Sequence, residues 1–156
     1  MAQAVEFVKA LDVGRRMDRR EDAAFILAMA PHLDREEQML IEHVFRDGLS
    51  AADYARVSGQ APRKAQRRIR LVIQRIYSPE FGFVLNYREL LPYRLRRAAR
   101  LLFLEGCGLR GTAERMGVSL HTVRGLRLEI VTRCRMHAEG QARAEAEKNK
   151  RAQGVQ

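Results

Sequence analysis

The feature that most constrains the fold of this chain is a spaced pattern that occurs twice, 58 residues apart. In each copy an alanine is followed by a glycine four residues later and by a small or apolar residue six positions after that. The matched pairs are Phe45 and Phe103, Asp47 and Glu105, Gly48 and Gly106, Ala55 and Ala113, Gly59 and Gly117, and Ala65 and Val123. A fixed offset of this kind predicts one small structural unit built twice.

The second copy has the residues that two short, closely crossing helices require. Ala113 is small enough for the point of contact. Gly117 suits the left-handed backbone that ends the first helix. Val118 is expected to enter the core of the turn, Ser119 to cap the second helix, and Val123 to return an apolar side chain to the first. The spacing therefore predicts a helix-turn-helix.

The second helix of this unit carries polar side chains that the fold does not need. They are Ser119, His121, Thr122, Arg124 and Arg127. Side chains of these types hydrogen-bond to phosphates and to base edges in the major groove of DNA. We expect them to bind DNA, and no catalytic group is needed to explain them.

The run GVSLHTVRGLR, residues 117–127, resembles the helix-turn-helix with which sigma factors bind the promoter −35 element. That family, and the bacterial regulators that share its module, commonly carry Gly-(Ile/Val)-Ser-x-x-Thr-Val-(Lys/Arg). Upstream, DREEQMLIEHVFRDGLS resembles the lead-in of the same module, with its acidic start, apolar helix and Asp-Gly-Leu-Ser. The resemblance implies promoter-type DNA binding and contact with RNA polymerase.

The first copy has its own helix signals but departs from the family at the turn. Asp34 and Glu37 are placed to form a capping box, Ser50 is placed to start the next helix, and Pro62 falls in the first turn of the one after that. Ser58 stands where the family usually has leucine, and QAPRKA replaces Ile-Ser-x-x-Thr-Val. Phosphate binding, more than base reading, is therefore the expected role of this copy.

The first copy is strongly basic, with seven basic residues and no acidic residue between positions 56 and 75. Its candidate DNA-binding residues are Arg63, Lys64, Gln66, Arg67 and Arg70. Arg94, Arg96, Arg97 and Arg100, in the lead helix of the second copy, are expected on the outside, where they would contact the flanking backbone. The alternative is that each basic run is an ordinary solvated helix face.

The excess positive charge of the chain is concentrated on the two copies of the pattern. The chain has a net charge of +10, and residues 56–135 contain 18 basic and 5 acidic side chains, whereas residues 1–30 carry five of each. A polyanion, double-stranded DNA, is the expected partner. No apolar run reaches the roughly 18 residues that span a bilayer, and no signal peptide is found, so a cytoplasmic, nucleoid-associated protein without membrane contact is expected.

The chain is predicted to be all-α, because no segment shows the alternation of a half-buried strand. The expected order is an N-terminal helical segment (1–30, with helices near 3–11 and 20–29), a first tri-helical helix-turn-helix module (31–77), a linker (78–90), a second such module (91–139) and a polar tail (140–156). The linker is apolar enough to dock on or between the modules. The tail is expected to be frayed helix or disordered.

Enzymatic and metal-dependent functions are not expected. The acidic clusters near residues 18–22 and 34–37 are better explained as helix starts and solvated faces than as catalytic carboxylates. Cys107, His121, Cys134 and His137 lack the paired close spacing of zinc ligands, so no metal site and no cofactor are predicted.

The leading hypothesis is a sequence-specific transcription regulator of bacterial or phage type. The alternatives are a sigma-like adaptor that binds RNA polymerase and promoter DNA, and a protein that coats DNA without sequence preference. A homodimer also stays open, because an apolar stripe through Ile130, Val131 and Met136 would serve either a dimer or an intramolecular core.

Overall fold

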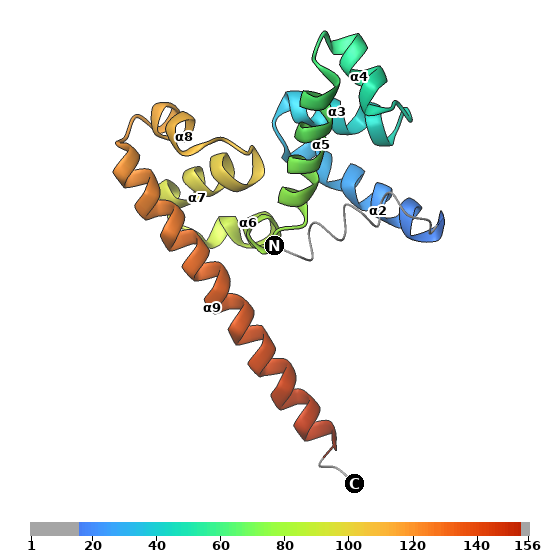
Figure 1. The fold of residues 1–156 in the computed structure, drawn as a ribbon. Helices are drawn as coiled ribbons and strands as arrows, with labels where there is room; N and C mark the ends of the chain where they lie inside the picture. The colour runs from blue at the N-terminus through green and yellow to red at the C-terminus, as the bar shows by residue number, and fades with distance from the viewer. Residues whose placement is uncertain (1–15, 154–156) are drawn as a thin grey trace.

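The computed structural model describes residues 16–153, and this part of the chain is helical with no β-strand. Figure 1 shows two groups of short helices joined by α6, with one long helix leaving the body. The elements are α2 (Arg16–Met29), η1 (Ala30–His32), α3 (Arg35–Phe45), α4 (Ala51–Ser58), α5 (Pro62–Ile76), α6 (Pro79–Tyr87), η2 (Arg88–Leu90), α7 (Tyr93–Ala99), η3 (Arg100–Leu104), α8 (Leu109–Met116) and α9 (Leu120–Gln153).

The pattern of the sequence reappears in the backbone at the same offset. The N–H of Gln60 donates to the carbonyl of Ala55 (2.9 Å), and the N–H of Val118 donates to that of Ala113 (3.0 Å). Gly59 and Gly117 end α4 and α8 with φ of 69° and 67°, a left-handed conformation that glycine adopts at little cost. The same turn therefore precedes α5 and α9.

Burial repeats as well, which places equivalent helix faces toward the interior. Buried pairs at the offset of 58 are Leu33 and Leu91, Leu40 and Ala98, Ile41 and Ala99, Ala55 and Ala113, Ala65 and Val123, Val72 and Ile130, and Ile76 and Cys134. We refer to residues 33–76 as the first repeat and to residues 91–134 as the second repeat. Ala113 and Val123 take the buried positions that the spacing predicts.

Helix starts follow the predicted caps, with one correction. Asp34 accepts from the backbone N–H groups of Glu36 and Glu37 (2.9 and 3.1 Å), and Ser50 accepts from that of Asp53 (3.1 Å). The predicted capping box is only half formed, because the Glu37 carboxylate pairs with Arg75 of α5 instead of closing the box. A long-range charge thus outcompetes the local bond.

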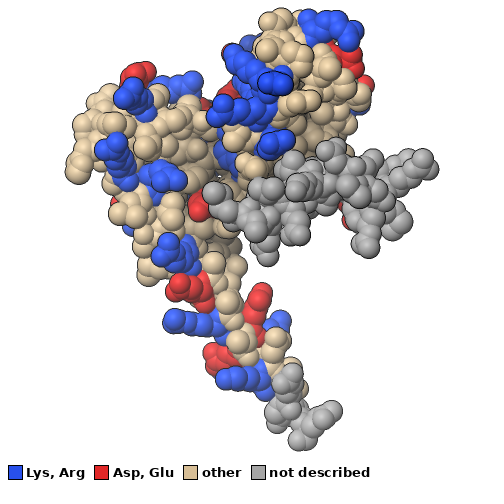
Figure 2. Space-filling view, viewed as in Figure 1, with Lys and Arg blue, Asp and Glu red and all other residues tan. Residues whose placement is uncertain are grey.

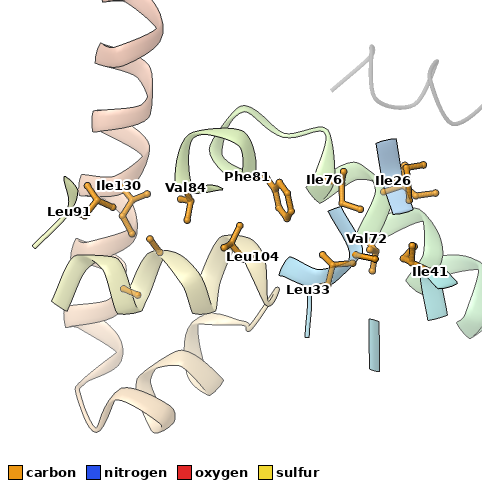
Figure 3. Close-up of a cluster of buried hydrophobic side chains, with 14 of the residues drawn as sticks. Ile26, Leu33, Ile41, Val72, Ile76, Phe81, Val84, Leu91, Leu104 and Ile130 are labelled. Atoms are coloured by element: carbon orange, nitrogen blue, oxygen red, sulfur yellow. The ribbon is translucent and has the colours of Figure 1, made fainter. Parts of the chain in front are cut away.

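The predicted linker at residues 78–90 forms structure of its own. Ser78 caps α6 by accepting from the N–H of Phe81 (3.2 Å), and Pro79 occupies the first turn. Phe81 and Val84 are 1% and 0% exposed, and Figure 3 shows them between side chains of the two repeats. The expected docking is observed, since one hydrophobic cluster runs from the first repeat through α6 to the second. A separate, smaller cluster in the first repeat consists of Leu40, Tyr54, Ala55 and Ala65.

The ends of the chain differ from the prediction. The helix expected near residues 20–29 begins earlier, at Arg16, and the helix expected near 3–11 lies outside the described residues. Helix α9 does not stop near residue 139 but continues to Gln153. Of the two alternatives expected for the polar tail, helix or disorder, the structure shows helix up to that residue. Figure 1 shows this part of α9 projecting from the body.

Candidate nucleic-acid interface

The candidate residues of the first repeat lie together on the outside of α5. Arg63, Lys64, Gln66, Arg67 and Arg70 are all exposed. Spacings of three and four residues put Arg63, Arg67 and Arg70 on one helix face. Figure 2 shows lysine and arginine side chains gathered over α5, on the side toward the second repeat.

These cations are free, whereas neighbouring arginines are used within the fold. Within the described residues, none of Arg63, Lys64, Arg67 and Arg70 forms an ion pair. By contrast, Arg56 pairs with Asp53 (2.9 Å) and Arg68 pairs with Glu36 (2.9 Å). The unpaired charges of α5 are therefore concentrated on the exposed face and available to an external anion.

In the second repeat the candidate residues lie at the start of α9. Ser119 caps the helix, because its Oγ accepts from the N–H of Thr122 (3.1 Å) and lies 2.9 Å from the Thr122 hydroxyl. His121, Arg124 and Arg127 are exposed, and in the described part of the chain their side chains form no hydrogen bond. The structure thus divides the five candidates into two that build the helix start and three that are free.

The two candidate helices differ in charge at equivalent positions. Arg63 and Gln66 of α5 correspond to His121 and Arg124 of α9, so the exposed polar residues begin at the same place in each helix. One turn later, Arg67 and Arg70 correspond to Gly125 and Leu128. The face of α5 is more cationic, and that of α9 carries a more varied set of hydrogen-bonding groups.

The arginines of α7 and η3 have partners that the sequence did not indicate. Arg94, Arg97 and Arg100 are exposed, as expected, but Arg96, Arg97 and Arg100 are each also bound within the fold. Arg96 Nη1 donates to Glu89 (2.8 Å), Arg97 Nη2 donates to the carbonyl of Arg115 (2.5 Å), and Arg100 Nε donates to Glu105 (2.6 Å). Among the described residues, Arg94 is exposed with neither an ion pair nor a side-chain hydrogen bond, whereas Arg97 is exposed and held only by the Arg115 carbonyl.

An internal ion pair that the sequence did not indicate joins α3 to α5. The side chains of Glu37 and Arg75 are only 11% and 17% exposed. Burial raises the pKa of the Glu37 carboxyl, and the adjacent guanidinium of Arg75 offsets part of that effect. The pair therefore ties α3 to α5, the helix that carries the exposed cations.

Other kinds of site are not assembled in the described part of the chain. No group of three or more histidine, cysteine, aspartate or glutamate side chains there is placed to hold a metal ion. Cys107 and Cys134 are free thiols, and burial raises the pKa of each. Among the helices of residues 16–153, none combines the length and hydrophobicity needed to cross a bilayer.

Comparison of the chain with protein-family models, with curated proteins and with solved structures gave no match.

Proposed function

We propose that this protein is a sequence-specific regulator of transcription that binds double-stranded DNA through two tandem helix-turn-helix modules, residues 31–77 and 91–139. In this proposal α5 and α9 are the recognition helices. The observation that carries it is the turn repeated before both helices, each of which then presents exposed polar side chains from its first turn. A recognition helix contacts base edges with residues near its N-terminus.

The modules have different roles in the proposal. The first grips phosphates through Arg63, Lys64, Arg67 and Arg70, because unpaired exposed cations release counterions from the duplex whatever its sequence. The second reads bases through His121, Arg124 and Arg127, since guanidinium groups recognise guanine edges and histidine offers a further hydrogen bond. Ser119 and Thr122 position this helix and bind phosphate at its start.

The shared core implies an asymmetric binding site. Because α6 packs between the repeats, the recognition helices keep one relative orientation and act as a unit. A single chain would then contact two neighbouring stretches of the major groove about 10 base pairs apart. Such a chain selects a non-palindromic site, whereas a symmetric dimer would select a palindrome.

Selection of bound duplexes from a random pool, followed by affinity measurements over a range of salt concentrations, tests the proposal. We expect a defined asymmetric motif that is bound about a thousandfold more tightly than a scrambled duplex. Equal, steeply salt-dependent affinity for all sequences would overturn specificity and leave a DNA-coating protein. Retention of RNA polymerase without DNA, together with such equal affinity, would favour the sigma-like adaptor instead.

A further inference from the structure

A cleft with a volume of about 540 Å³ separates the start of the first repeat from the lead helix of the second. One wall is the segment from Pro31 to Leu33, and the other is formed by η2, α7 and η3. None of the lining residues belongs to α5 or α9. The cleft is therefore distinct from the proposed DNA-binding faces.

The wall of this cleft carries more positive than negative charge. Four of its lining residues are arginines, namely Arg88, Arg96, Arg97 and Arg100, and its two carboxylates are those of Glu89 and Glu105. Glu89 lies between Arg88 (3.3 Å) and Arg96 (2.8 Å), while Glu105 holds Arg100 (2.6 Å). Arg96 also donates to the carbonyls of Glu89 and Leu91, and Arg97 donates to that of Arg115, so all four guanidinium groups are held in place. The lining as a whole carries two more positive than negative charges.

We propose that this cleft binds a small phosphate-bearing anion of the diphosphate type. Guanidinium groups match phosphate oxygens with two parallel hydrogen bonds, a geometry that a simple halide cannot use. Four guanidinium groups along one wall suit a ligand with more than one anionic centre. The volume is in the range of about 300–1,000 Å³ that is common for small-molecule sites.

The bound anion would link the two repeats. Arg97 and Arg100 belong to the second repeat, whereas His32, on the facing wall, comes directly before the first. A ligand that bridges these walls binds the folded chain and not the unfolded one, so it raises thermal stability by mass action. This inference does not depend on whether α5 and α9 bind DNA.

Titration of the full chain with inorganic pyrophosphate at constant ionic strength tests the site, with heat of binding and thermal stability as readouts. We expect saturable binding that weakens about tenfold or more in Arg97→Ala/Arg100→Ala, because two charged hydrogen-bond donors are lost. Glu89→Gln removes a competing carboxylate and is expected to tighten binding. Glu129→Gln makes the same change on α9, where its partner Arg133 lies outside the cleft, and is expected to leave binding unchanged.

Several results would overturn the proposal. One is the absence of saturable binding, and another is pyrophosphate binding that the double arginine variant leaves intact. If Glu89→Gln and Glu129→Gln tightened pyrophosphate binding equally, the cause would be the net charge of the protein and not the cleft. If the double variant loses DNA affinity while pyrophosphate does not bind, the cleft serves DNA phosphates instead. Glu89 is largely exposed, so Glu89→Gln keeps the test decisive even if the double variant does not fold.

Discussion

The guanidinium of Arg75 occupies the space into which a side chain at Gly106 would extend. A Cβ on Gly106 would overlap Nη1 of Arg75 and would also lie too close to Cζ of the same side chain. Arg75 lies in α5 of the first repeat, and Gly106 lies in the turn before α8 of the second. Arg75 is also held by its ion pair with Glu37. The junction between the repeats therefore requires a residue without a side chain at position 106.

Replacing Gly106 with alanine is expected to destabilise the protein more than replacing Gly48, its equivalent in the first repeat. Both glycines have positive φ (66° and 72°), so both substitutions cost roughly 1 kcal/mol for a left-handed alanine. A Cβ at Gly48 meets nothing within 4 Å. Gly106→Ala must also displace Arg75 from Glu37. We expect this to lower the free energy of unfolding, measured in urea, by about a further 1–3 kcal/mol.

The background Glu37→Leu/Arg75→Ala isolates that contact, because it removes the guanidinium without leaving an unpaired buried carboxylate. Leucine suits position 37, since its equivalent in the second repeat is Leu95. In this background Gly106→Ala and Gly48→Ala are expected to cost the same. A persistent difference between them would show that Arg75 is not its cause.

Replacing Ala113 with leucine is expected to reduce the free energy of unfolding by about 1–3 kcal/mol through overpacking. Ala113 is 8% exposed, and the turn that it shares with Gly117 and Val118 brings α8 against α9. Ala142→Leu, at an exposed position of α9, is the matched control and is expected to change stability little. Chemical denaturation compares the two, and equal stability would refute a close helix crossing at Ala113.

The parts of the fold that the sequence predicts are those fixed by local chemistry. Gly59, Gly117, Ser50 and Ser119 act within one or two turns of themselves, so spacing alone locates them. In the segment that forms α6, Ser78 and Pro79 are typical of a helix start but also of a loop, and Gly82 favours the loop. Its helix is stabilised by burying Phe81 and Val84 between repeats that are distant in the sequence.

Contacts between residues far apart in the sequence were missed for the same reason. In the sequence, Arg97 and Arg100 are typical of a solvated helix face. Only the folded chain brings the carbonyl of Arg115 to Arg97. Glu37 matches a local capping box, yet its partner Arg75 lies 38 residues away. Exposed residues such as Arg67 and Arg124 were easier to place, because the buried face of each helix fixes the opposite one.

The phenol of Tyr77 is expected to stay protonated well into the alkaline range. Burial and the nearby charge of Asp22, which accepts a 3.2 Å hydrogen bond from the hydroxyl, raise the pKa of Tyr77 to about 12. In the unfolded chain the group ionises near pH 10, so its contribution to stability is complete below about pH 10 and is lost as pH rises through about 12.

Two measurements on wild type and Tyr77→Phe check this expectation. The difference in phenolate absorbance is expected to give a midpoint near the pKa of about 12. Between pH 9 and pH 11, wild type is expected to lose more stability than the variant, since only wild type has this group to titrate. A midpoint for Tyr77 at the ordinary tyrosine value would contradict the partial burial of its phenol beside Asp22 of α2.

Alanine substitutions in the two proposed recognition helices are expected to have different effects on DNA binding. Arg124→Ala should cost about 1–3 kcal/mol on the selected site, with little change on a scrambled duplex, because it removes a base contact. Arg67→Ala should weaken binding to both duplexes alike and reduce the slope of log affinity against log salt by about 1.

Arg56→Ala is the control for both substitutions. Arg56 is as exposed as the candidate residues, but its charge is balanced by Asp53 at 2.9 Å, so its loss is expected to change neither specificity nor the salt slope appreciably. If Arg56→Ala matched Arg67→Ala, the effect of α5 would be one of net charge and not of a defined face. If Arg124→Ala weakened both duplexes equally, α9 would contact only phosphates, and the proposed base reading by the second module would be wrong.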